Sequence, residues 1–353
     1  MGFWGEGAAL ALVAAAFAAC GAALSTLCGP IDTPNARSNH RTPRPRAGGL
    51  SLSLGAGAAA LALAFGLAPE LRAALGPDTA RLATILAAGG AFAILGLLDD
   101  LSIIGLRRKF FGTIALALLA AWAAGPAPVL DGGAFVLTLP WWFAFAGAAL
   151  FVFVAVNAVN FMDGSDGMMA ANLFVAGAAL ALFGLSGGAP VAAVCGLFLA
   201  GGCAGFALFN APRARVFSGD AGAFFGAALF ACGALDLARN GPAGAIWIAP
   251  LLLAPFLGDV FATLVARARR GAKLTEGHSE HVYQLLIACG WSHPRVALLY
   301  AGMSVFCVAA AGMALAVGPG RAALALAVVA PGGLGLALYA RKRLNRRAVT
   351  MRG

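Results

Sequence analysis

Long apolar stretches separated by short polar segments run along the whole chain. Windows of about 19 residues, the length of a membrane-spanning helix, identify eleven candidate spans. They lie at 7–29, 48–68, 80–98, 110–125, 140–159, 169–186, 188–209, 222–237, 244–266, 296–316 and 321–340. The sixth and seventh are divided only by two glycines, so ten spans are the alternative. The pattern predicts an all-α, polytopic transmembrane helix bundle that forms one integral membrane domain over residues 1–353.

Composition excludes an ordinary soluble protein. The chain is 61% hydrophobic and only 11% charged, whereas a soluble domain carries roughly 25% charged residues. A soluble core of this length has no room for so much apolar surface. The surrounding solvent must therefore be a lipid bilayer.

Basic residues are distributed unevenly between the two sides of the predicted bundle. If the N-terminus lies outside, twenty of the 24 Lys and Arg residues fall inside, in the loops and the C-terminal tail. Positive charge marks the cytoplasmic side, so we expect the N-terminus outside and the C-terminus in the cytoplasm. The net charge of +10 then reflects topology and contact with anionic membrane lipids rather than binding to nucleic acid.

Acidic residues gather on the same predicted face. Asp99 and Asp100 end the third span, and neighbouring helical side chains point about 100° apart, so one carboxylate can face a metal ion while the other faces a second group. Asp220 opens the eighth span. It can cap the helix, or it can hold Mg²⁺ beside phosphates gathered at the helix N-terminus. The clustering of acids favours the second interpretation.

The segment at 157–167, NAVNFMDGSDG, follows the fifth span. Its glycines allow tight turns, and Asn160, Asp163 and Asp166 offer oxygen ligands or hydrogen bonds to sugar and base groups. An ordinary capped turn is the alternative. We expect these three residues to bind substrate.

Histidines and arginines supply the complementary charge. His278, His281 and His293 lie in the last large inside loop, and His40 lies in the first. A zinc site is one interpretation of this loop, but no cysteine pair supports it, and His can instead bind a diphosphate. Arginines of the Pro-rich first loop suit phosphate geometry. We take His281, His40, Arg44 and Arg46 as candidate substrate-binding residues.

Several carboxylates with cationic side chains at one membrane face are the usual equipment of phosphoryl transfer. A site at the membrane suggests that one reactant is a lipid. The active site is expected in the cytoplasmic loops, which lie near 30–47, 99–109, 160–168, 210–221 and 267–295. The residues therefore indicate a metal-assisted phosphotransferase that acts on a lipid phosphate.

Four short motifs carry a family resemblance. They are IDTPNARSNH at 31–40, GLLDD at 96–100, NAVNFMDGSDG at 157–167 and GDAG at 219–222. In this order the chain resembles the polyprenyl-phosphate N-acetylhexosamine-1-phosphate transferases, glycosyltransferase family 4. The resemblance implies Mg²⁺-dependent transfer of a sugar-1-phosphate from a UDP-aminosugar to undecaprenyl phosphate, with release of UMP. It also implies a place in the bacterial inner membrane, so that the outside N-terminus would be periplasmic and the active site cytoplasmic. Mn²⁺ is the alternative ion, and a homodimer is left open.

The resemblance also implies roles for single residues. Asp99 would deprotonate or orient the lipid phosphate, and Asp220 would bind the metal with Asp100 nearby. Asn160 and Asp163 would hold the nucleotide or its diphosphate. Whether attack is direct or passes through an aspartyl intermediate stays open.

One departure bears on the substrate. Lipid I synthases carry three adjacent histidines in the last large inside loop, whereas this chain has HSEHVYQ at 278–284. That run resembles the branch that initiates O-antigen, with GlcNAc or deoxy-aminosugars such as FucNAc or QuiNAc as donors. The alternatives are a lipid I synthase that uses UDP-MurNAc-pentapeptide, an ion-coupled secondary transporter and a non-catalytic membrane anchor. Asp259 is the one acid placed deep enough in a span for a transporter.

Overall fold

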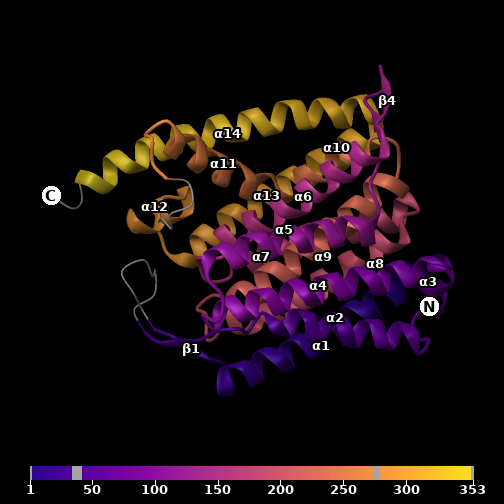
Figure 1. The fold of residues 1–353 in the computed structure, drawn as a ribbon, viewed down its shortest axis with the longest axis horizontal. Helices are drawn as coiled ribbons and strands as arrows, with labels where there is room; N and C mark the ends of the chain where they lie inside the picture. The colour runs from indigo at the N-terminus through magenta and orange to yellow at the C-terminus, as the bar shows by residue number, and fades with distance from the viewer. Residues whose placement is uncertain (1, 34–41, 274–278, 351–353) are drawn as a thin grey trace.

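The protein is a bundle of helices in a computed structural model that describes residues 2–33, 42–273 and 279–350 (Figure 1). Helices are expected because the core of a bilayer offers no water to satisfy backbone groups. The helices are α1 (Phe3–Cys28), α2 (Leu50–Ala64), α3 (Pro69–Leu75), α4 (Asp78–Asp100), α5 (Leu106–Ala124), α6 (Trp141–Met162), α7 (Met168–Gly187), α8 (Pro190–Asn210), α9 (Gly219–Asn240), α10 (Ala245–Ile248), the 3-10 turn η1 (Pro250–Leu253), α11 (Ala254–Ala268), α12 (Val282–Ala288), α13 (His293–Val317) and α14 (Pro319–Thr350). The predicted all-α bundle is confirmed.

Every predicted span coincides with a helix or with consecutive helices. In the described part of the chain, nine helical segments are long and apolar enough to cross a membrane, with α10 to α11 taken as one. Helices α2 and α3 bend by 92° at a short break and make a tenth if they form one span. Helix α5 opens with three basic residues, which keep it outside the nine. Ten is thus the count with α2–α3 taken as one span, and eleven requires α5 to cross as well.

Small residues let the helices approach closely. Gly201 and Gly205 of α8 lie against backbone carbonyls of Ala11 and Ala15 in α1, where a Cβ would clash. Close backbone packing of this kind is what associates helices in lipid, where no hydrophobic force drives them together. Helix α9 lies at the centre of the bundle, because 94% of its most apolar stretch is buried inside the protein, against 6% for α14.

Two small hairpins mark opposite ends of the bundle (Figure 1). Strands β1 (Ile31–Asp32) and β2 (Arg44–Pro45) pair antiparallel, with Asp32 opposite Arg44. Strands β3 (Val129–Asp131) and β4 (Val136–Thr138) also pair antiparallel. Strand β1 and helix α12 lie at the left end in Figure 1, and β4 lies at the right end. The candidate site occupies the end with β1 and α12.

Candidate active site

The end of α4 is fastened to the beginning of α9 by Asp100. Its carboxylate is buried and accepts hydrogen bonds from the backbone N–H groups of Asp220, at 2.9 Å, and Ala221, at 3.1 Å. These groups have no partner within α9, and a carboxylate there is also favoured by the helix dipole. Arg46 places Nε 3.2 Å from Oδ1 of Asp100. Asp100 therefore holds Asp220 in place and joins the first loop to the site.

Glycines make this close approach feasible. Gly219 begins α9 with φ +67°, a left-handed conformation that glycine adopts without strain. A Cβ on Gly219 would lie 2.9 Å from Cγ of Asp100. One turn before the aspartates, a Cβ on Gly96 would come within 2.5 Å of the backbone of Asp220. The glycines of GLLDD and GDAG thus allow the two helices to touch.

Two carboxylates share one ammonium group. Nζ of Lys109, near the start of α5, lies 2.8 Å from Oδ2 of Asp99 and also donates to Oδ2 of Asp220. The side chain of Asn160 also hydrogen-bonds Asp220. Residues from α4, α5, α6 and α9 therefore converge on Asp220. The sequence interpretation missed Lys109, whose charge the topology rule already explained; its position ten residues after Asp99 was the available signal.

Asp163 lies beside this group. Its Oδ2 accepts a hydrogen bond from the hydroxyl of Ser218, just before α9. Burial raises the pKa of Asp163 well above its usual value, and the nearby charges of Asp220 and Asp100 raise it further, against the hydrogen bond from Ser218. Asp163 therefore takes up a proton more readily than an exposed aspartate does.

Asp166 connects three loops. Its Oδ2 lies 3.4 Å from Nη1 of Arg44 and accepts a hydrogen bond from the backbone of Ala214 at 3.0 Å. The neighbouring Ser165 contacts Nδ1 of His293, at the start of α13, at 3.0 Å. Arg44 and Asp166 are thus brought together, and their substrate-binding roles stay predictions.

His281 lies against the segment at 157–167. It is 4% exposed, and its ring centroid lies 6.1 Å from that of Phe161. Tyr283, two residues later, donates from its hydroxyl to the carbonyl of Phe161 at 3.2 Å and lies against Gly164. The last inside loop therefore packs onto the segment that holds Asn160 and Asp163. His40 and His278 lie outside the described residues.

The oxygen donors of the site bear on whether it can hold a metal ion. Among the residues that the structure describes, no three His, Cys, Asp or Glu side chains are grouped as a metal site. Mg²⁺ in phosphate-binding enzymes usually takes only one or two carboxylates, with water and substrate phosphate completing its shell. Asp99 and Asp220 approach Nζ of Lys109 from two helices, and carboxylate oxygens of this kind are the hard ligands that Mg²⁺ prefers. The residues therefore fit Mg²⁺ in a substrate complex.

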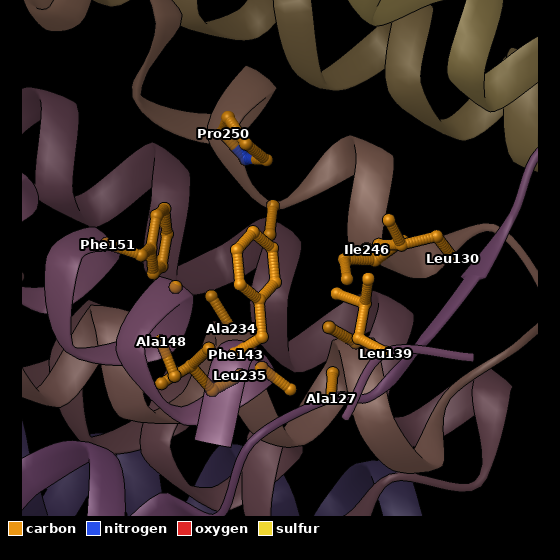
Figure 2. A pocket seen from close by; sticks show the side chains of 14 residues that line it. Ala127, Leu130, Leu139, Phe143, Ala148, Phe151, Ala234, Leu235, Ile246 and Pro250 are labelled. Carbon is orange, nitrogen blue, oxygen red and sulfur yellow. The ribbon is translucent and has the colours of Figure 1, made fainter. Parts of the chain in front are cut away.

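An apolar pocket of about 230 Å³ lies at the other end of the bundle (Figure 2). Its lining includes Phe143 and Phe151 of α6, Leu235 of α9 and Pro250 of η1. These residues come from the half of α6 far from Asn160 and the half of α9 far from Asp220. Because none of the described residues that line it is charged, the lining shows no group for binding phosphate.

Comparisons with known proteins agree with the site. Glycosyl transferase family 4 matches residues 82–238, which contain Asp99, Asp100, Asp163 and Asp220. A phospho-N-acetylmuramoyl-pentapeptide-transferase of Desulforudis audaxviator is 31% identical over 61% of this chain and 69% of its own length. The chain belongs to glycosyl transferase family 4. The family resemblance of the sequence is confirmed, and the chain is a sugar-phosphate transferase rather than a transporter or an anchor.

Other relatives of this family-4 chain carry different names. The decaprenyl-phosphate N-acetylglucosaminephosphotransferase of Mycobacterium tuberculosis is 28% identical over 78% of this chain and 73% of the relative. A probable undecaprenyl-phosphate N-acetylglucosaminyl 1-phosphate transferase of Bacillus subtilis is 26% identical over 75% and 72%. The family-4 relatives thus include both N-acetylglucosamine and muramoyl-pentapeptide enzymes.

Proposed function

We propose that this chain transfers an N-acetylhexosamine-1-phosphate from a UDP-sugar to undecaprenyl phosphate and releases UMP. The donor would be UDP-GlcNAc or a deoxy-aminosugar such as FucNAc or QuiNAc, and the product would initiate O-antigen or another cell-envelope polysaccharide. The observation that carries the proposal is the convergence of Asp99, Lys109 and Asp220 at one end of an apolar bundle. We place this end at the cytoplasmic face of the bacterial inner membrane, with the N-terminus in the periplasm.

Mg²⁺ belongs to the proposal as the cofactor. Asp220 would hold it, with Asp99 or Asp100 beside it. When bound, such an ion screens the phosphate charges and stabilises the charge that develops on the transferred group. Asp99 has the more accessible carboxylate for this purpose, because both oxygens of Asp100 already accept backbone hydrogen bonds.

The remaining residues position two anionic reactants that repel each other. The ammonium of Lys109 lowers the cost of bringing a lipid phosphate near Asp99 and Asp220. Asn160 supplies a hydrogen-bond donor for nucleotide or diphosphate oxygens, and Asp163 lies beside it as a second group that contacts the nucleotide. Arg44 and Arg46 lie beside them on β2 and just after it, where their guanidinium groups can reach a diphosphate.

The muramoyl-pentapeptide donor is the second candidate, and one named relative favours it. The run HSEHVYQ at 278–284 favours the smaller aminosugars instead, because it lacks the three adjacent histidines of lipid I synthases. The two candidates share acceptor and leaving group, so only the donor distinguishes them.

A donor panel tests the proposal. Purified protein in lipid nanodiscs would receive undecaprenyl phosphate, Mg²⁺ and one of UDP-GlcNAc, UDP-FucNAc, UDP-QuiNAc or UDP-MurNAc-pentapeptide. We expect UMP with at least one of the three aminosugars and none with the pentapeptide. UMP only with the pentapeptide would establish the second candidate, and no UMP with any donor would refute both.

A further inference from the structure

Asp259 is a buried acid that the proposed chemistry does not use. It lies in α11, is 2% exposed, and is surrounded by an apolar span. An ionisable side chain in such a place is costly unless it is fully hydrogen-bonded, and it usually has a function. Because the chain is a sugar-phosphate transferase, the ion-carrying function that a transporter would give this acid does not apply.

The partners of Asp259 explain its position. Oδ1 accepts from the backbone N–H of Val282 at 2.8 Å, and Oδ2 accepts from that of Tyr283 at 3.1 Å. The hydroxyl of Tyr300, on α13, donates to Oδ2 at 2.6 Å. The hydroxyl of Thr263, one turn later in α11, donates to Oδ1 at 3.3 Å. Both oxygens are therefore occupied, and two of these four donors belong to the segment that directly follows His281.

His281 itself faces the same carboxylate. Its Nδ1 lies 3.3 Å from Oδ1 of Asp259, and its ring packs between Phe161 and Tyr283. Tyr283 continues the contact to the carbonyl of Phe161, three residues before Gly164. A continuous set of contacts thus joins Asp259 to the segment that bears Asn160 and Asp163.

We infer that Asp259 is a positioning residue that orients His281 toward the bound sugar-phosphate donor. The inference rests on the proposed function. One carboxylate hydrogen-bonds the backbone on the C-terminal side of His281 and also contacts its ring nitrogen. The ring accepts a further hydrogen bond from the backbone N–H of Gln284, because His281 is the N-cap of α12. Neither a shorter side chain nor an amide can accept all these hydrogen bonds, because an amide has one acceptor oxygen.

Steady-state kinetics of the full-length protein in nanodiscs test this role, with the donor that the wild type uses. We expect Asp259→Asn to lower kcat about 10- to 100-fold, as when groups that orient metal-binding histidines are removed, with KM for undecaprenyl phosphate unchanged. Asp236→Asn is the matched control. Asp236 is another fully buried acid that accepts a backbone hydrogen bond, from Ala192, but it lies at the opposite end of α9.

A double-mutant cycle separates orientation from simple stabilisation. If Asp259 acts through His281, adding Asp259→Asn to a His281→Ala variant lowers kcat by less than about twofold. The reason is that the effects of residues that act as a unit are not additive. A full additional loss in that background, or unchanged kcat in Asp259→Asn alone, would overturn the inference. Should Asp259→Asn fail to fold, Tyr300→Phe removes one donor to the same carboxylate and must show the same dependence on His281. An inactive wild type would instead refute the proposed function.

Discussion

At the scale of single residues, the site depends on one ammonium group shared by two carboxylates. Lys109 contacts Asp99 and Asp220, which come from different helices and would repel each other without it. Asp100 fixes the position of Asp220, because its carboxylate accepts hydrogen bonds from the first turn of α9. The single ammonium group therefore offsets part of the negative charge of the two carboxylates before any substrate phosphate enters.

Replacement of Lys109 tests that balance. We expect Lys109→Met to lower UMP release at least about 100-fold, the usual effect of removing one preorganised cationic or hydrogen-bonding group from a transition state. Arg108→Ala is the control, since Arg108 is the exposed neighbour on α5. Initial rates at saturating donor measure both. Equal rates of UMP release for Lys109→Met and Arg108→Ala would show that Lys109 does not contribute to the reaction.

Much of this cluster could be predicted from the sequence. Asp99, Asp100 and Asp220 could be grouped because each lies at a span end on one predicted face. Lys109 could not, because a basic residue beside a span has a sufficient explanation in membrane topology. Asp259 could not be linked to His281 either, since that contact depends on how α11 packs against a loop 22 residues away. The local sequence pattern can predict which residues lie at the ends of helices. It cannot predict which side chains of different helices meet, because that depends on how the helices pack.

At the scale of elements, the site forms only if α4 and α9 touch. Gly96 is the point of contact, where a Cβ would lie 2.5 Å from backbone atoms of Asp220. Packing in protein interiors is too dense to absorb such an atom without movement of a helix. The spacing of Asp99 and Asp220 is thus set by a glycine, which has no side chain.

An alanine at this contact is expected to disrupt the site. Gly96→Ala should lower stability by about 1–3 kcal/mol, the usual cost of overpacking, and should abolish most UMP release. The control is Gly90→Ala in the same helix, where a Cβ meets nothing within 4 Å. Thermal unfolding followed by tryptophan fluorescence and initial rates compare the two. Equal melting temperatures and equal rates of UMP release in Gly96→Ala and Gly90→Ala would show that close packing at Gly96 is not required.

Helix α14 is attached to the last loop through Glu280. This carboxylate accepts from Arg267 at 2.8 Å and from Arg341 at 2.5 Å, and it also pairs with Arg270. Burial raises the pKa of Glu280, but the three arginines outweigh burial and hold the pKa below its usual value of 4.5. The segment before His281 is thereby fixed to α11 and α14.

The lowered pKa predicts a pH dependence of stability. Because the folded state binds the proton of Glu280 more weakly than the unfolded state, its contribution is present above the unfolded pKa and is lost as pH falls through the folded pKa. Glu280→Gln should therefore lower the melting temperature at pH 7, and the difference should shrink below about pH 4.5. Glu70→Gln, at an exposed site on α3, is the control. If the difference in melting temperature between wild type and Glu280→Gln grew as the pH fell, the predicted stabilisation by ionised Glu280 would be wrong.

At the scale of the whole molecule, two ends of the bundle have different characters. One end, where β1 and α12 lie in Figure 1, carries the carboxylates that pair with Lys109. The other end carries the hairpin of β3 and β4 and the apolar pocket of Figure 2. The distribution of basic residues predicts that the first end faces the cytoplasm. Nucleotide sugars are water-soluble, so this orientation would give the donor direct access.

Cysteine labelling tests the predicted orientation. In a variant without native cysteines that still releases UMP, Val136→Cys on β4 should react with a membrane-impermeant maleimide in intact spheroplasts. Arg108→Cys should react only after the membrane is opened. Both positions are exposed in the structure, so burial does not account for a difference. The reverse pattern would invert the topology.

The central claim is that phosphate moves together with the sugar. The most direct measurement uses UDP-GlcNAc, or whichever aminosugar donor the panel identifies, labelled with ³H in the sugar and ³²P in the β-phosphate. We predict that both labels appear in equal amounts in the polyprenyl lipid, that unlabelled UMP leaves, and that Asp220→Asn transfers neither label. Lipid that carries ³H alone, with ³²P left in released UDP, would contradict the account.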